Sequence, residues 1–179
     1  ETYKGGMILA LTAGYNQGAP VKIDLSGDLT MSQNISSKYP GIIGSMTTDY
    51  GDAGDLNIDV DGTFSISDYS SIANSLSGPS PRGDGADINI TADVISILNF
   101  SSLSGQYEGR GQGGSVNIET RTFHLGDKSR LATGIKGWGD SGDITINASE
   151  SMLISDVGTQ IDARCTFNYG QTAGTINVT

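Results

Sequence analysis

The sequence predicts an all-β protein that folds as a parallel β-helix, a solenoid with three short strands in each coil. Three observations support this. An alternating apolar–polar tetrapeptide recurs every 28 to 35 residues, a second alternating segment follows it, and no segment has the period of a helix. One coil alone cannot bury its inward side chains, but stacked coils bury a continuous apolar column. The repeats predict about five to six coils.

Each coil begins with a strand in which apolar and polar residues alternate, as expected of a strand with one buried face. The copies are residues 21–24, 56–59, 88–91, 116–119, 144–147 and 176–179. Their first residues lie 35, 32, 28, 28 and 32 positions apart. This spacing is too regular for chance and too loose for a coiled coil.

A second strand follows each of the first five copies and ends on Asp, Asn or Gln, at residues 29–33, 64–68, 95–99, 123–127 and 152–156. Asp and Asn suit a bend there, because both tolerate left-handed backbone angles. Third strands are expected at Ile72, Leu103, Leu131 and Ile161, with Ile35 a poorer match. A glycine-rich connection then leads to a tetrad before the next coil, at residues 52–55, 84–87, 112–115 and 140–143.

Composition excludes several classes of protein. The chain has 179 residues, 26 glycines, one cysteine and a net charge of −10. A lone cysteine rules out a disulfide framework, and an acidic chain with scattered cations lacks the basic patch of a nucleic-acid binder. The longest apolar run, residues 7–11, is far short of the roughly 20 residues that span a membrane, so no membrane insertion is expected. We expect one domain, with residues 1–17 as an amino-terminal partial coil and 18–179 as the repeats.

Residues 51–58, Gly-Asp-Ala-Gly-Asp-Leu-Asn-Ile, return in related form at 83–90 and 139–146. This motif resembles the repeats of large secreted bacterial exoproteins of the filamentous haemagglutinin type, and the resemblance covers residues 18–179. Those proteins are adhesins exported by two-partner secretion. The resemblance implies a right-handed parallel β-helix, displayed outside the cell on the bacterial surface.

Equivalent positions of successive coils lie above one another, so two acidic columns are expected. One contains Asp55, Asp87 and Asp143, interrupted by Ser115, and the other contains Asp52, Asp84 and Asp140, interrupted by Gln112. Calcium prefers oxygen-rich clusters and would relieve the repulsion between stacked carboxylates. The alternative is a solvated acidic edge whose aspartates cap tight turns. No cofactor is expected to be required, although calcium fits the pattern.

Two sets of loop residues are candidates for partner binding. Arg82-Gly83-Asp84 in an exposed loop could engage integrins, although Gly83-Asp84 is also this repeat's copy of the Gly-Asp that opens other tetrads. The second set is aromatic and consists of Tyr50, Tyr107, Trp138 and Phe167. Such rings can stack on sugars, pack against a neighbouring protein or cover their own coil.

Catalysis has little support in the sequence. The outward positions of the first strands are 22, 57, 89, 117, 145 and 177, and none is a carboxylate. They predict a ladder of Asn and Thr side chains that hydrogen-bond along the stack. His124 is expected to point to solvent, and Cys165 has no partner for nucleophilic chemistry. We therefore expect no enzyme, since a carbohydrate-active β-helix would need clustered carboxylates in a groove.

The two ends of the sequence bear on function. Residues 7–11 resemble a second or third strand, and residues 175–179 form a first strand with nothing after it. The chain is then either a segment of a long adhesin or a subunit that stacks end to end. The leading expectation is a non-catalytic structural and adhesive module of a secreted bacterial surface exoprotein, whose partner is a surface glycan or protein of a host or neighbouring cell. The alternative is a subunit of an extracellular filament built by head-to-tail strand pairing.

Overall fold

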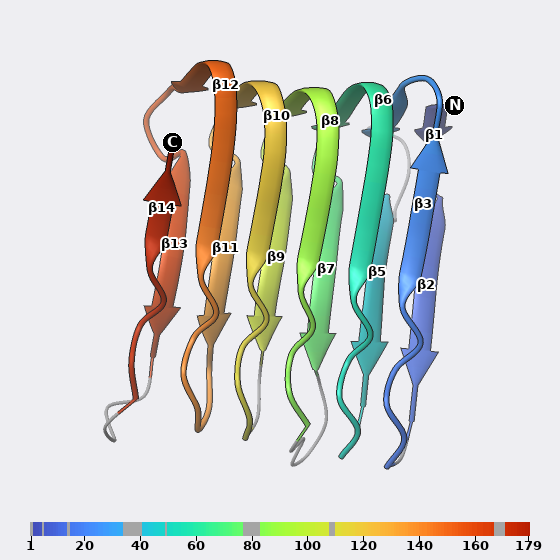
Figure 1. Cartoon of the computed structure of the whole chain (residues 1–179), viewed down its shortest axis with the longest axis vertical. Coiled ribbons are helices and arrows are strands. Elements are labelled where there is room, and N and C mark those ends of the chain that lie inside the picture. Colours follow the sequence, from blue (N-terminus) through green and yellow to red (C-terminus); the bar gives the residue numbers. More distant parts are fainter. Residues whose placement is uncertain are drawn as a thin grey trace.

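The structure is a computed structural model that describes residues 2–4, 6–13, 15–33, 41–48, 50–76, 83–107, 110–166 and 171–179. All regular elements within these ranges are β-strands. Figure 1 shows the strands side by side in chain order, so that each turn of the chain lies on the turn before it. The chain is a parallel β-solenoid, which confirms the predicted parallel β-helix.

Two parallel sheets form the walls of the solenoid. The first contains β1 (Thr2–Lys4), β4 (Leu29–Ser32), β6 (Leu56–Ser67), β8 (Ile88–Ile97), β10 (Val116–Leu125), β12 (Ile144–Ile154) and β14 (Ile176–Val178), with β3 (Val21–Leu25) paired to β6. The second contains β2 (Met7–Thr12), β5 (Ile42–Thr47), β7 (Ser71–Leu76), β9 (Ser102–Tyr107), β11 (Arg130–Ile135) and β13 (Gln160–Cys165). Residues 7–11 thus begin a strand of the second sheet, as the sequence predicted.

The predicted first and second strands are continuous in most coils. They remain separate only as β3 and β4, and they join into single strands in β6, β8, β10 and β12. Pairing shifts register between Val60 and Thr63 and again between Thr120 and Thr122, which marks the bend. Figure 1 shows these strands curving over at their upper ends. Hydrogen bonding to neighbouring coils continues around the bend, so no break interrupts the strand.

The core is the apolar column inside the solenoid. Leu56 and Phe64, on either side of the bend in β6, and Ile72 of β7 are each 0% exposed. The equivalent residues of the next coils are equally buried: Ile88, Ile95 and Leu103, then Val116, Phe123 and Leu131. Alternation along each strand directs these side chains inward, as the repeat predicted.

Tight turns join the two sheets at the end of the second predicted strand. Asp68, Asn99, Asp127 and Asp156 have φ angles of 57°, 54°, 53° and 74°, which confirms the expected left-handed bend. In three of these turns the next residue is left-handed as well: Tyr69, Phe100 and Lys128, at 63°, 61° and 61°. The sequence did not predict this second position.

The glycines of the tetrads permit close backbone packing between coils. A Cβ atom on Gly114 would lie 1.9 Å from the carbonyl oxygen of Ala86, and one on Gly142 would lie 2.1 Å from that of Gly114. Real Cβ atoms do not approach backbone oxygens so closely. We call the connection from the second sheet, together with its tetrad, the return loop of a coil. Glycine is therefore required where the return loop of one coil rests on that of the coil before.

Gly114→Ala should lower the free energy of unfolding by about 1–3 kcal/mol, because the new methyl group displaces the backbone of the neighbouring coil. Chemical denaturation followed by circular dichroism measures the change. Gly27→Ala is the matched control, since a Cβ there would meet nothing within 4 Å. Equal stability of the two variants would contradict the close packing of the return loops.

Candidate functional site

The return loops place one predicted acidic column at the edge of the solenoid. Asp84 donates its backbone N–H to Oδ1 of Asp52 at 2.8 Å, and Gln112 donates its own to Oδ1 of Asp84 at 2.7 Å. Thr172 donates in the same way to Oδ1 of Asp140 at 2.7 Å. Each carboxylate therefore binds the equivalent backbone position of the next coil.

The second acidic column repeats this arrangement. Oδ1 of Asp55 accepts the backbone N–H of Asp87 at 3.1 Å, and Oδ1 of Asp87 accepts that of Ser115 at 2.8 Å. Oδ1 of Asp143 accepts the N–H of Thr175 at 2.7 Å. Ser115, which interrupts the column, accepts the backbone N–H of Asp143 on its hydroxyl oxygen at 3.2 Å.

These contacts are those expected of aspartates that cap tight turns. The hydrogen bonds from the backbone and hydroxyl of Thr172 hold the pKa of Asp140 below its usual value of 3.8. Within the described ranges, no group of three or more His, Cys, Asp or Glu side chains is arranged to hold a metal ion. Each of the six aspartates thus accepts a backbone N–H from the next coil, as the turn-capping alternative predicts.

Buried polar side chains of the second sheet fasten the return loops from inside. Ser45 accepts the backbone N–H of Gly54 at 3.1 Å, Asn74 donates to the carbonyl of Asp87 at 3.1 Å, and Thr133 donates to that of Gly142 at 2.6 Å. The sequence analysis missed these residues. Their signal is a small or polar residue two positions after the inward Ile or Leu of each third strand.

The outward face of the first sheet carries the predicted amide ladder. Asn89 donates its side-chain amide to Asn57 at 3.0 Å, and Asn117 donates to Asn89 at 2.9 Å. The ladder is thereby confirmed for these three coils. His124 lies on the outward side between the buried Phe123 and Leu125, as alternation predicts, and its Nε2 is 3.2 Å from the hydroxyl of Ser155 in the next coil.

Arginine–carboxylate pairs also link successive coils. Arg121 lies 2.8 Å from Asp93 of one neighbouring coil and 2.6 Å from Glu150 of the other. The Arg121 hydrogen bond lowers the pKa of Asp93. On the second sheet, burial alone would raise the pKa of Asp162, but hydrogen bonds from Arg164 and Arg130 lower it overall. The pairs of Arg121 with Asp93 and Glu150 and the pair of Arg130 with Asp162 link neighbouring coils, whereas Arg164 pairs with Asp162 within β13.

The predicted loop aromatics are only partly described. Tyr50 stacks on Tyr15 with ring centroids 4.9 Å apart and planes 6° apart. Trp138 is 50% exposed, and the guanidinium carbon of Arg110 lies 5.8 Å from its ring centroid. Tyr107 ends β9, where the structure describes the backbone alone.

Two of the predicted contact residues, Arg82 of the Arg-Gly-Asp tripeptide and the aromatic Phe167, lie outside the described residues. Gly83 and Asp84 lie in a return loop. Asp84 occupies the acidic column as the other tetrads predict, because its Oδ1 accepts the backbone N–H of Gln112.

The turns between the sheets hold a second aromatic pair that the sequence analysis missed. The rings of Tyr69 and Phe100 stack with centroids 5.1 Å apart and planes 4° apart, and they are 59% and 49% exposed. Nζ of Lys128, in the next coil, lies 5.3 Å from the centroid of Phe100. The available signal was an aromatic or basic residue directly after the Asp or Asn of three successive bends.

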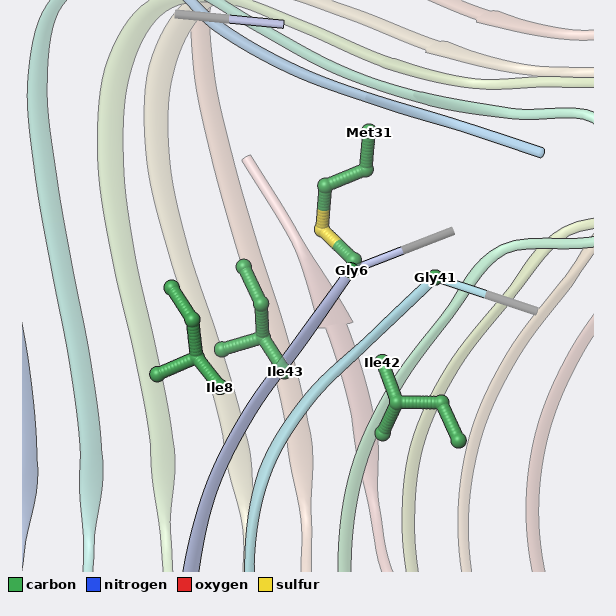
Figure 2. Close-up of a pocket in the computed structure, with 6 residues that line it drawn as sticks. All are labelled: Gly6, Ile8, Met31, Gly41, Ile42 and Ile43. Carbon is green, nitrogen blue, oxygen red and sulfur yellow. The ribbon is translucent and has the colours of Figure 1, made fainter. Parts of the chain in front are cut away.

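Figure 2 shows a hollow near the amino-terminal end of the core, where the side chains of Ile8, Met31 and Ile43 come close together. The complete lining is Gly6, Ile8, Met31, Gly41, Ile42 and Ile43. These side chains provide no acid, base, nucleophile or metal ligand. The hollow is thus part of the apolar column, near the coil that begins it.

No family model matches the chain, and searches of curated proteins and of solved structures also give no match. The part of the chain that the structure describes contains no helix of the length and apolarity needed to cross a membrane.

The lowered pKa of Asp140 predicts a dependence of stability on acid. A carboxylate whose pKa is depressed by folding stabilises the protein above its unfolded value and loses this effect as the pH falls through its folded value. The free energy of unfolding should therefore decline from about pH 5 to below 3.8. Asp140→Asn should flatten this decline in urea titrations at each pH. Asp59→Asn, on the outward face of β6, is the control, and an equal flattening there would contradict the prediction.

Proposed function

We propose that the chain is a non-catalytic structural and adhesive module of a secreted bacterial surface exoprotein. The observation that carries this proposal is the use made of the polar side chains. Aspartates, asparagines and arginines such as Asp52, Asn89 and Arg121 are engaged in bonds between coils, whereas aromatic side chains project from the loops and turns. A solenoid bonded in this way is a stiff spacer that holds contact residues at fixed intervals.

The repeat motif supports the same proposal. Residues 51–58 and their copies resemble the repeats of filamentous haemagglutinin-type exoproteins, and the glycines and aspartates of that motif are the residues that pack and bond the return loops here. An adhesive role places the partner on the surface of a host or neighbouring cell, as a glycan or a protein. Exposed aromatic and arginine side chains, such as Trp138 and Arg110, are of the types that dominate such contacts.

Adhesion is measured with beads coated with the 179-residue chain and washed under shear over cultured epithelial cells or bacterial cells. We expect the folded chain to retain several times more beads than the same chain denatured before coupling, because contact requires the fixed spacing of the rod. A glycan array then separates sugar from protein partners. Equal retention of the folded and denatured chains would contradict the adhesive role.

The second candidate is a subunit of an extracellular filament built by head-to-tail pairing of solenoid ends. The specific observation is the exposure of the two inward residues of β14. Ile176 and Val178 of β14 are 44% and 49% exposed, whereas Ile144 and Ile146, their partners in β12, are 0% exposed. A further coil stacked on β14 would bury this apolar surface, and in the proposed filament a second copy supplies that coil by strand pairing.

Sedimentation velocity and negative-stain microscopy of the purified chain test this second candidate. A ladder of end-to-end oligomers is expected, and the double variant Ile176→Lys/Val178→Lys should abolish it by placing charge in the apolar column. Asn177→Lys adds a charge to the outward face of the same strand and should leave the ladder intact. A monomer at all concentrations would exclude the filament and leave the adhesive role untouched.

A further inference from the structure

The corner between the two sheets is built from three similar turns in successive coils. The left-handed pairs are Asp68-Tyr69, Asn99-Phe100 and Asp127-Lys128, and the turns close with backbone hydrogen bonds such as Ser129 N–H to Gly126 O at 3.0 Å. Asp and Asn accept left-handed angles readily, but the second position of such a turn favours glycine. Large side chains occupy it three times in succession, which indicates that these side chains serve a purpose beyond closing the turn.

The three side chains form one continuous feature, here called the corner ridge: Tyr69, Phe100 and Lys128. The two rings lie nearly parallel at 5.1 Å, and the ammonium group of Lys128 follows Phe100 at 5.3 Å. The rings keep 59% and 49% of their surface exposed, although aromatic side chains gain most from burial. The ridge therefore combines a fixed geometry with unused apolar surface.

The charges beside the corner ridge are mostly negative. Asp68, Asp127 and Asp156 occupy the preceding position of their turns, and the whole chain carries a net charge of −10. Asp68 accepts hydrogen bonds from the Asn99 amide at 3.0 Å and from the Ser67 hydroxyl at 3.0 Å, which fix its carboxylate next to the rings. Aromatic faces and fixed carboxylates both attract cations.

We propose that the corner ridge, with Asp68, Asp127 and Asp156 beside it, binds a lysine- or arginine-rich peptide segment of a partner protein. Phe100 is stacked on Tyr69 and already holds the ammonium group of Lys128, so Tyr69, 59% exposed, is the ring that offers a surface to a cation of the partner. The ridge is one side chain wide in each coil, which suits an extended segment better than the broad face of a globular partner. The net charge disfavours anionic polymers and anionic membranes. This inference deepens the adhesive role proposed above and rests on it.

Binding is measured by fluorescence anisotropy with a labelled peptide of alternating lysine, arginine and glycine. The double variant Tyr69→Asn/Phe100→Asn removes both rings and keeps residues that tolerate left-handed angles. We expect it to weaken binding by about two- to fivefold, the effect of one exposed cation–aromatic contact at Tyr69. Tyr15→Ser, which removes an exposed ring from a return loop, should change affinity by less than about twofold. Circular dichroism establishes that each variant remains folded.

A second pair of variants separates a local site from general attraction to an acidic rod. Asp68→Asn/Asp127→Asn and Asp24→Asn/Asp59→Asn remove the same charge, the first at the corner ridge and the second on the outward face of the first sheet. The first should weaken binding several-fold more than the second at moderate salt. Equal losses, or no effect of removing the rings, would overturn the inference. A glutamine-substituted peptide or a neutral oligosaccharide that binds equally well would also overturn it.

The bead assay distinguishes this inference from the proposed function. Beads that carry Tyr69→Asn/Phe100→Asn and still adhere normally would refute the corner ridge as the contact and leave the adhesive role standing. If beads coated with the unmodified folded chain adhere no better than beads coated with the denatured chain, the adhesive role itself is refuted.

Discussion

Parallel pairing between successive coils is the interaction on which the rest of this structure depends. Strands in a sheet lie about 4.8 Å apart, so each residue of one coil rests on its counterpart in the next. The strands keep this register on either side of each bend, as in Val116 paired with Ile88 on one side and Ile144 on the other. Any property that recurs in the repeat therefore becomes a column in space. The core, the acidic columns, the amide ladder and the corner ridge are all columns of this kind.

Stacking of this sort brings like charges together, and the acidic columns show how the chain tolerates it. Two carboxylates about 5 Å apart in a water-like medium repel by about 1 kcal/mol. A hydrogen bond to a charged acceptor contributes about 1.5–3 kcal/mol, so an aspartate such as Asp87, which binds the backbone N–H of Ser115, stabilises the column on balance. Gln112 and Ser115 break both columns in the same coil and reduce the repulsion further. The sequence analysis considered calcium for the same pattern, because stacked carboxylates can either bind a cation or cap tight turns.

The elements that could be predicted from the sequence are those identified by residues that are close together in the chain. Alternation within 21–24 or 88–91 identifies a half-buried strand, and Asp or Asn after the second strand identifies a left-handed turn. The elements that could not be predicted depend on contacts between coils. Asn74 breaks the apolar pattern of its strand, and its hydrogen-bond partners lie far away in the sequence, at Ser45, Gly54, Ala86 and Asp87. Tyr69 and Phe100 are 31 positions apart, so their stacking becomes visible only when the register of the coils is known.

Variation in coil length is shared between the connection that leads to the tetrad and the segments before the second sheet, which include the bends where the register shifts. The tetrad then restores the register, because its glycine packs on the previous return loop and its aspartates bind the next one. Gly54 and Gly142 do this in coils whose connections differ in sequence. Side chains on the connections, the turns and the outward faces are consequently free of the packing that fixes the core. A binding surface can change at those positions without altering the column that supports it, which is the separation of scaffold and contact that an adhesive rod requires.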